Sequence, residues 1–321
     1  MNQSKSFLAL LDDISVINVA GEQAHEYLHG QVTVATNPFD VASAKIAAHC
    51  DFKGKMFSTM FVSYSEALDA STPHFKLWAH TDGAKESLLQ LKKYGVFSKV
   101  DIAIDTDVKV YGGFGEHCFE QLHVFFPSLN KQHLSVQSNQ FGQIITFNDN
   151  TMRFLVCLTT CGQERLADVL NGEKLVDKQY WDRLEILAGL ANIQQATVGE
   201  YVPQMLNLQS IGAIDFDKGC YMGQEVVART KFLGKNKRAC FIAKCDAQDV
   251  DVSKVSVASA IEIKLGENWR RAGSLNRFAI ADKELHVLVV LPIDTEIGSI
   301  IRIKDSNILL TIGPLPYNNL N

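Results

Sequence analysis

The sequence predicts an α+β protein of more than one domain that ends in a small β-barrel or sandwich. The chain has 321 residues, and at roughly 100–200 residues per domain this length indicates two or three domains. Strand-like alternation and helical periodicity are mixed through about the first 235 residues. After about residue 240, short strand-like runs recur with turns between them and no helical pattern, which is typical of a small all-β unit.

The first third of the chain predicts a compact unit of strands and helices. One helix contains Tyr27 and Leu28 and ends at Gly30, and another begins at Thr81 or Asp82 and ends near Gly95. The alternation of apolar and polar residues predicts strands over 14–19 and 100–104. Two further strands are expected over 45–50 and 56–64, joined by a turn at 51–54, and another over 75–79.

The same criteria predict a second mixed region and the C-terminal strands. Further strands are expected over 108–114, 141–147 and 153–158. Helices are expected over 163–171, over 177–189 and, as a short segment, after Gly223. The C-terminal strand-like runs cover 240–244, 261–265, 286–291, 299–303 and 308–312.

Composition and charge exclude several classes of protein. With 46% hydrophobic and 21% charged residues, the chain has enough apolar side chains for a sizeable core, and its net charge of −5 excludes a basic nucleic-acid coat. No apolar run approaches the roughly 20 residues that span a bilayer, and the N-terminus lacks a signal-peptide pattern. The seven cysteines form no CxxC pair and no zinc pattern, which favours free thiols in the cytoplasm and no metal site.

The most unusual stretch is Asp-Lys-Gly-Cys-Tyr-Met-Gly-Gln-Glu at 217–225. Two glycines bracket Cys220 and Tyr221, so the backbone can turn sharply there. A helix start after the thiol and a positive charge at Lys218 both favour the reactive thiolate. The alternative is a buried structural cysteine in a tight turn, because free cysteine is among the most buried residue types.

The segment around this motif carries a concentrated positive charge. Residues 218–238 contain six basic side chains and one acidic side chain, Glu225, on a chain that is acidic as a whole. This basic strip predicts an anionic partner such as a polyglutamate tail, a phosphate or RNA. The alternative is a solvated face without a partner.

The octet Lys218–Glu225 resembles the K-G-C-[FY]-x-G-Q-E signature of the YgfZ family, folate-binding tRNA-modifying proteins related to the aminomethyltransferase (T-protein) of glycine cleavage. The resemblance extends over the whole chain. It includes 48–56 (AHCDFKGKM), 91–100 (LKKYGVFSKV), 266–271 (GENWRR) and 314–317 (PLPY).

This resemblance implies an aminomethyltransferase-like ring of several domains around a central folate site, with a C-terminal small β-barrel. It implies a discontinuous folate-binding domain made of 1–44 and about 111–235, an inserted domain of about 45–110, and a barrel of 236–321. It also implies a cytoplasmic protein that binds tetrahydrofolate and supports the maturation or repair of iron–sulfur enzymes, including enzymes that thiolate tRNA.

The resemblance also implies site residues. Trp181 matches a tryptophan that contacts the folate, and an indole can stack on a flat ring. A second family tryptophan is Ile14 here, which can line a pocket but cannot stack. Relatives carry a glutamate where this chain has Leu187. Glu185 lies two positions away on the same helix, so it is expected to face elsewhere.

The remaining site residues lie near the motif. Asp51, in the turn 51–54, resembles an acidic residue that approaches the reactive nitrogens of folate in T-proteins. The alternative is a turn aspartate that bonds its own backbone. Lys218, Arg229 and Lys231 are candidates for the carboxylate tail of a polyglutamylated folate, and the other cofactor-binding candidates are Tyr221, Gln224 and Glu225.

The sequence therefore predicts a folate-binding accessory protein of tRNA modification with Cys220 as the functional thiol. Two alternatives stay open. One is a true folate-dependent one-carbon transferase, and the other is a module that contacts tRNA directly through 218–238.

Overall fold

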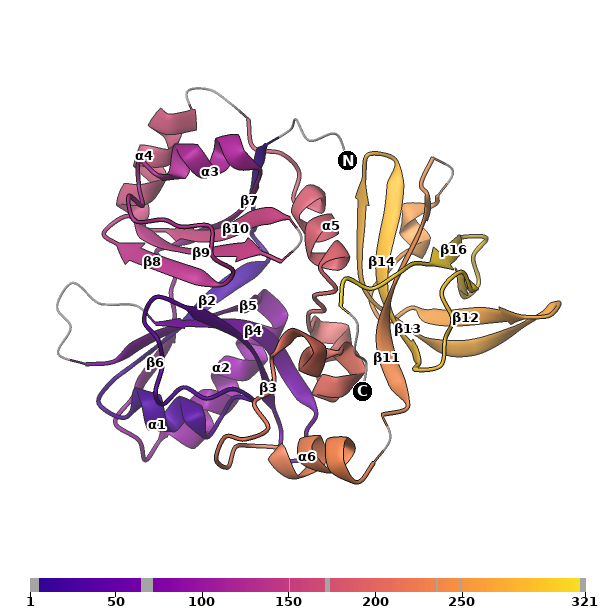
Figure 1. Cartoon of the computed structure of the whole chain (residues 1–321), viewed down its shortest axis with the longest axis horizontal. Coiled ribbons are helices and arrows are strands. Elements are labelled where there is room, and N and C mark those ends of the chain that lie inside the picture. Colours follow the sequence, from indigo (N-terminus) through magenta and orange to yellow (C-terminus); the bar gives the residue numbers. More distant parts are fainter. Residues whose placement is uncertain are drawn as a thin grey trace.

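Three antiparallel sheets form the body of the molecule in the computed structural model, which describes residues 6–64, 72–149, 151–170, 174–234, 236–248 and 250–317. Within these residues two sheets have five strands each, and the third is a closed barrel of six strands. The two open sheets lie one above the other on the left of Figure 1, and the barrel lies on the right.

The first sheet has the strand order β3-β4-β5-β2-β6. Its strands are β2 (Ile14–Ala20), β3 (Ala44–Cys50), β4 (Met56–Tyr64), β5 (His74–His80) and β6 (Asp101–Ile104), and its helices are α1 (Ala24–His29) and α2 (Thr81–Gly95). Leu28 of α1, Leu77 of β5 and Leu91 of α2 are completely buried in one core cluster. The helices therefore cover the sheet with the faces that their apolar spacing predicts.

The second sheet has the order β1-β7-β10-β9-β8. It consists of β1 (Phe7–Leu10), β7 (Lys109–Phe114), β8 (Ser135–Asn139), β9 (Gly142–Asn148) and β10 (Met152–Leu158), with α3 (Glu116–Leu122) and α4 (Thr160–Leu170) beside it. The sequence grouped residues 1–44 with about 111–235. In the structure β1 joins this sheet whereas β2 joins the first sheet, so the strand pairings divide those 44 residues between two sheets.

A helical segment connects the second sheet with the barrel. It contains α5 (Gln179–Leu187), three short 3-10 turns over Gln195–Thr197, Pro203–Leu206 and Leu208–Ile211, and α6 (Gln224–Phe232). Helix α5 lies between the second sheet and the barrel in Figure 1. On one side Trp181 packs on Gly112 of β7, where an added Cβ would come within 2.3 Å of the indole. On the other side Asp182 forms an ion pair with Arg277 of the barrel.

The barrel closes in the order β11-β14-β13-β12-β15-β16. Its strands are β11 (Arg238–Asp246), β12 (Ala260–Leu265), β13 (Asn268–Ala281), β14 (Glu284–Pro292), β15 (Ile300–Ile303) and β16 (Leu309–Ile312). Inward-facing aliphatic side chains such as Leu275, Val287 and Ile301 are completely buried and fill its interior. The predicted α+β class and the C-terminal β-barrel are confirmed.

The sequence patterns did not predict several elements of the structure. These are the strands β1, β8 and β13 and the helix α3. In β13 the polar residues Arg270, Arg271, Asn276 and Arg277 interrupt the apolar alternation, and a register shift between Leu275 and Arg277 changes which side chains face inward. None of the helices within the described residues is long and apolar enough to cross a membrane.

Candidate functional site

A narrow cavity of about 50 Å³ lies where the three sheets meet. Ile14 of β2 and His80 of β5 line it from the first sheet, Leu155 of β10 from the second, and Arg277 of β13 from the barrel. Trp181 of α5 completes the wall between them. We call this space the central cavity.

The central cavity brings together two residues that the sequence analysis assigned to a folate site, Ile14 and Trp181. Trp181 is only 2% exposed and belongs to an apolar core cluster that the first and second sheets share. Gly112 covers the indole, and the guanidinium of Arg153 lies 5.7 Å from the centre of its ring. Trp181 therefore both supports the core and forms part of the cavity wall.

Glu185 also lines the central cavity, so the expectation that it faces elsewhere is wrong. Its Oε1 accepts a hydrogen bond of 2.7 Å from Nη1 of Arg153, and its Oε2 lies 3.7 Å from Nη1 of Arg277. Burial raises the pKa of Glu185, while Arg153 and Arg277 oppose this rise. The expectation assumed that α5 has one buried face and one exposed face. In the structure every residue from Trp181 to Ile186 is buried, so helical spacing alone cannot tell where Glu185 points.

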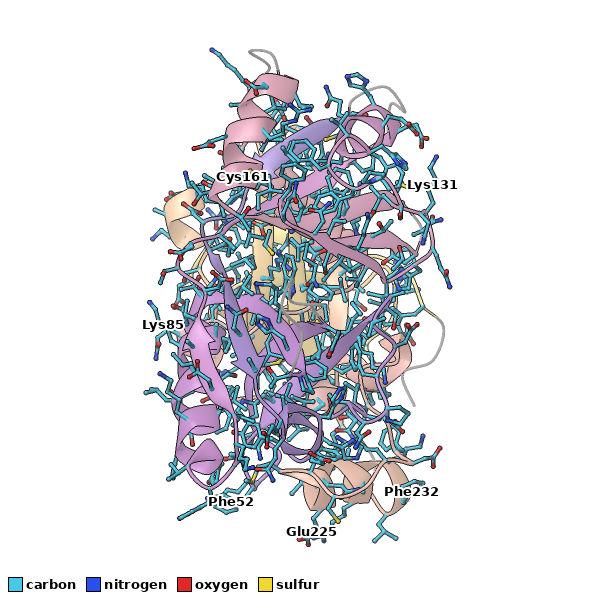
Figure 2. All side chains as sticks on the ribbon, turned by 90° about the vertical axis from the view of Figure 1, so that its left-hand side faces the viewer. Phe52, Lys85, Lys131, Cys161, Glu225 and Phe232 are labelled. Carbon is cyan, nitrogen blue, oxygen red and sulfur yellow. The ribbon has the colours of Figure 1, made fainter. Side chains whose placement is uncertain are left out.

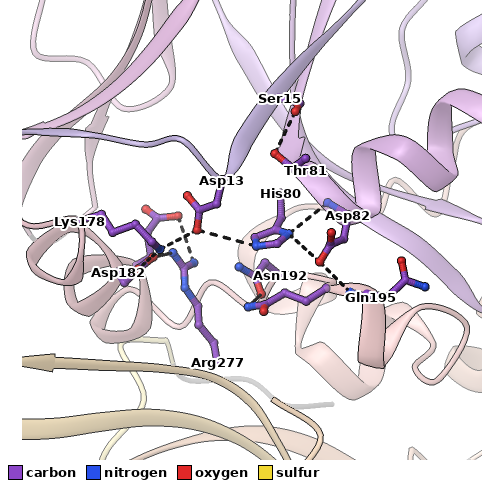
Figure 3. A network of polar contacts seen from close by, with 12 residues as sticks. Asp13, Ser15, His80, Thr81, Asp82, Lys178, Asp182, Asn192, Gln195 and Arg277 are labelled. Carbon is purple, nitrogen blue, oxygen red and sulfur yellow. Dashed lines mark hydrogen bonds and ion pairs between the residues drawn. The ribbon is translucent and has the colours of Figure 1, made fainter. Parts of the chain in front are cut away.

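Beside the cavity, Arg277 belongs to a network of charged side chains with Asp182, Lys178 and Asp13 (Figure 3). Arg277 donates to Asp182 at 2.6 Å, and Lys178 bridges Asp182 at 2.7 Å and Asp13 at 2.6 Å. Burial alone would raise the pKa of Asp182, but Arg277 and Lys178 together hold it below its ordinary value. The network ties α5 to the barrel and to the start of β2.

His80 stands at the other end of this network. Its Nε2 lies 3.8 Å from Asp13, and its Nδ1 accepts a 3.3 Å hydrogen bond from the backbone N–H of Asp82 at the start of α2. Burial lowers the pKa of His80, with Asp13 and Asp82 opposing the shift. A neutral imidazole whose Nδ1 accepts this bond carries its proton on Nε2, on the side of Asp13.

The central cavity thus has an apolar wall around an indole and a polar wall that contains the carboxylate of Glu185 and the guanidinium of Arg277. Such a combination suits a flat ring with hydrogen-bonding edges. A folate would be held by Trp181 and Ile14 on its faces, with Glu185 and Arg277 at its polar edge. At about 50 Å³ the cavity has room for only a few water-sized molecules, so a ring of this kind would fit only with its walls in a wider arrangement.

The octet Lys218–Glu225 forms a second site at the end of the molecule where α6 lies. We call residues 217–223 the Cys220 loop and residues 51–55 the Asp51 turn. Gly223 has φ of +83°, and an added Cβ there would come within 2.5 Å of the backbone oxygen of Asp51. Gly54, with φ of +71°, packs in turn against Val226 of α6. The loop and the turn are therefore in direct contact, and both glycines are required for it.

Lys218 points into the protein rather than toward the thiol side of the loop. Its Nζ donates to the backbone oxygens of His29 at 2.5 Å, Val32 at 2.7 Å and Val34 at 2.9 Å. All three ammonium protons are engaged, and the oxygen of His29 belongs to the C-terminal end of α1, where a positive charge is favourable. Burial lowers the pKa of Lys218 to about 8. This lysine anchors the Cys220 loop and has no proton left for a folate carboxylate.

Cys220 is exposed, and so is Cys161; the other cysteines of the described residues are buried or half-buried. Cys50, Cys157 and Cys240 are completely buried, and burial raises the pKa of the Cys157 thiol to about 11 and that of Cys240 to about 12. The alternative of a buried structural thiol therefore does not apply to Cys220.

The other predicted residues of the motif have local roles. The ring of Tyr221 is 8% exposed and lies 4.9 Å from Nζ of Lys218. Gln224 and Glu225 begin α6, where the exposed carboxylate of Glu225 suits the positive end of the helix. Arg229 is exposed on α6, as are Lys231, Lys237 and Arg238 of the basic strip, while Lys235 lies outside the described residues.

Asp51 belongs to the Cys220 end and not to the central cavity. Its Oδ1 accepts hydrogen bonds of 2.8 Å from the backbone N–H groups of Lys53 and Lys55, which closes its own turn. Ile46, which does line the cavity, lies five residues back along β3, about 16 Å away at roughly 3.3 Å per residue. The structure therefore divides the predicted site residues into two groups.

The arrangement of the three sheets defines the class of protein. The chain has the aminomethyltransferase-like fold, because its structure is similar over 98% of its length to a glycine cleavage system aminomethyltransferase T from Bartonella henselae. The TM-score is 0.76, with 15% sequence identity and 86% of that chain covered. At this identity the likeness shows the fold alone.

Sequence comparison gives the particular family. Residues 236–306 match the family model described as "YgfZ, beta-barrel domain". The tRNA-modifying proteins YgfZ of Klebsiella pneumoniae (strain 342) and of Escherichia coli O127:H6 are each 37% identical to the chain over 314 residues. These alignments cover 97% of this chain and 93% of each relative. The chain belongs to the YgfZ family.

Proposed function

We propose that this protein is a folate-binding accessory factor in tRNA modification and in the maturation or repair of iron–sulfur enzymes, and that it acts in the cytoplasm through the thiol of Cys220. The tRNA-modifying role is supported by the names of its relatives, which match almost the whole chain. Tetrahydrofolate is the proposed ligand of the central cavity, and iron–sulfur enzymes that thiolate tRNA are the proposed partners.

The exposed thiol of Cys220 is the observation that carries this proposal. The Cys220 loop is fixed by Lys218 on one side and by the Gly223 contact on the other, yet its thiol stays open to solvent. A thiol in a rigid, accessible loop can attack a disulfide of a partner, form a mixed disulfide and release the other sulfur as a thiolate. Buried thiols such as Cys157 cannot do this.

Asp51 favours an accessory factor over a one-carbon transferase. A transferase needs a group that handles a proton at the ligand's reactive nitrogen. Asp51, the candidate for that task, closes its own turn instead and is absent from the cavity wall among the described residues.

Two measurements on the full chain test the proposal. Calorimetric titration with tetrahydrofolate should show binding, and the Cys220→Ser variant should bind equally well while it fails to restore tRNA thiolation in a deletion strain. Transfer of a methylene group from a carrier amine to tetrahydrofolate by the purified protein would instead establish the transferase.

A further inference from the structure

The Cys220 end of the molecule exposes aromatic side chains that no part of the described chain covers. Phe52 in the Asp51 turn is 67% exposed, and Phe232 at the end of α6 is 66% exposed. The neighbouring Leu233 is 85% exposed. In Figure 2 the labelled Phe52, Glu225 and Phe232 lie at one end of the molecule, and Cys161 lies toward the opposite end.

Backbone contacts hold the two aromatic positions on neighbouring elements. The Asp51 turn packs on α6 through Gly54 and Val226, where an added Cβ on Gly54 would be 3.0 Å from the Val226 Cβ. Phe232 is further positioned by Phe216, whose ring centre lies 6.2 Å away in an edge-on arrangement. The two elements that carry the exposed rings are therefore held side by side by the fold.

Each exposed ring has a lysine beside it. Nζ of Lys53 lies 5.4 Å from the ring centre of Phe52. Nζ of Lys231 lies 5.9 Å from the ring centre of Phe232 and 3.8 Å from that of Phe216. The rings thus offer flat apolar faces, and the ammonium groups next to them offer positive charge.

Basic side chains extend this surface toward the barrel. Through Lys55 the Asp51 turn contacts the loop between the 3-10 turns Gln195–Thr197 and Pro203–Leu206, because Nζ of Lys55 donates to the backbone oxygen of Glu200 at 2.6 Å. Glu200 lines an open cleft of about 360 Å³ together with Arg238 and Arg271, both of which are exposed. A flexible anionic chain could therefore run from the exposed rings into a cleft with two arginines.

We propose that this surface binds unpaired nucleotides of RNA, with bases stacked on Phe52 and Phe232 and phosphates at Lys53, Lys231 and Arg229. Every base has a flat face, and aromatic rings interleaved with positive charges are the combination that single-stranded nucleic acids recognise. An acidic peptide would use the charges but would leave the two exposed rings without a matching group. The inference rests on the proposed role in tRNA modification, and it presents the RNA beside Cys220.

The test is a fluorescence anisotropy titration of the full-length protein with a short labelled single-stranded RNA of mixed sequence, without folate. Phe52→Ala and Phe232→Ala should each weaken binding by about tenfold, in line with the cost of losing one base–aromatic stack. The matched control is Ile297→Ala, because Ile297 is a 69% exposed apolar residue of the barrel. It should bind RNA like the unaltered protein, and thermal melting should show that all three variants are folded.

Charge and base exposure are tested separately. Arg229→Gln and Lys231→Gln should weaken binding and reduce its dependence on salt, whereas Lys131→Gln, near the end of the molecule that holds Cys161 in Figure 2, should not. The same RNA annealed to its complement should bind more weakly, because its bases are already stacked. The inference would be overturned if the protein bound the duplex or an oligoglutamate as tightly as the single-stranded RNA. It would also be overturned if the folded Phe52→Ala and Phe232→Ala variants bound the single-stranded RNA as tightly as the unaltered protein. Because folate is absent from the assay, these outcomes are independent of whether the central cavity binds it.

Discussion

Gly223 lies directly against Asp51, and no side chain fits between them, since a Cβ on Gly223 would be 2.5 Å from the Asp51 backbone oxygen. This contact joins two segments that are far apart in the sequence, 48–56 and 218–225. The position of the Cys220 loop therefore depends on a turn of the first sheet.

Gly223→Ala should destabilise the protein more than an ordinary glycine substitution. The left-handed backbone costs an alanine about 1–2 kcal/mol, and the clash with Asp51 adds about 1–3 kcal/mol. Gly212→Ala is the matched control, because Gly212 has φ of +70° but nothing within 4 Å of an added Cβ. Urea unfolding of both variants measures the difference, and equal losses would show that the contact is soft.

Cys220 and Cys161 should be alkylated by iodoacetamide at neutral pH, while Cys50, Cys157 and Cys240 stay protected. Exposure of the first two thiols and burial of the other three are the physical reason. Site-resolved mass spectrometry measures the rates. Cys161→Ser is the control for function, since it removes an exposed thiol elsewhere. If Cys220→Ser and Cys161→Ser support tRNA thiolation equally well in a deletion strain, the proposed role of Cys220 is wrong.

Lys218→Met should lower the free energy of unfolding by more than about 2 kcal/mol. The substitution keeps a long side chain but leaves three backbone oxygens without their ionic donor. Lys237→Met is the comparison, because Lys237 is exposed and its loss should change stability by less than about 0.5 kcal/mol. Denaturation that is identical for the two variants would mean that water replaces the lysine without cost.

Asp182→Asn should destabilise the protein at pH 7 by about 3–5 kcal/mol, because it leaves the buried charge of Arg277 incompletely paired. The native pKa of Asp182 lies below its ordinary value. The carboxylate therefore stabilises the fold fully above its ordinary pKa, and this stabilisation is lost as the pH falls through the lowered native pKa. The variant should therefore lose less stability than the natural protein between neutral and strongly acidic pH.

The control for this experiment is Glu284→Gln. Glu284 pairs with Lys244 at 2.8 Å on the surface of the barrel, where its side chain is 42% exposed. Its removal should cost less than about 1 kcal/mol. Thermal melts of the three proteins across the pH range give the comparison, and parallel curves for Asp182→Asn and the natural protein would contradict the assignment.

Glu185→Gln should weaken tetrahydrofolate binding by about tenfold or more, because the amide places an N–H group where the ligand's own N–H donors need an acceptor. Calorimetric titration measures the affinity, and the Glu284→Gln protein serves as control. The ligand should also raise the melting temperature of the natural protein. Full affinity in a folded Glu185→Gln variant would remove this carboxylate from the proposed ligand site.

Most of the fold could be predicted from apolar periodicity. Strand β2 (ISVINVA) shows the apolar alternation of a strand, and the glycines at 95 and 223 mark a helix end and a helix start. Strand β13 could not be found in this way, because Arg277 looks like a surface residue in the sequence. Its burial depends on the opposite charges of Asp182 and Glu185, which lie about 90 residues earlier in the chain.

The sequence indicated some residues of the two candidate sites but neither their grouping nor the cavity residues Glu185, Arg277 and His80. The sequence indicated Trp181, Ile14 and Asp51 for one folate site, yet only the first two line the central cavity. The inward direction of the Lys218 side chain also could not be predicted, because its hydrogen-bond partners are backbone oxygens of a segment about 190 residues earlier. Local patterns identify reactive residue types, whereas long-range packing decides which of them meet.

Because the central cavity and the Cys220 loop share no residue among those described, the proposed ligand of the cavity and the proposed partner of the loop would contact different residues. Binding of one would then leave the residues of the other site free, so that a ternary complex could form in either order. A reagent that modifies Cys220 covalently would then prevent the partner from reacting at the loop without occupying the central cavity. The protein would then respond separately to the concentration of the small molecule and to that of the partner.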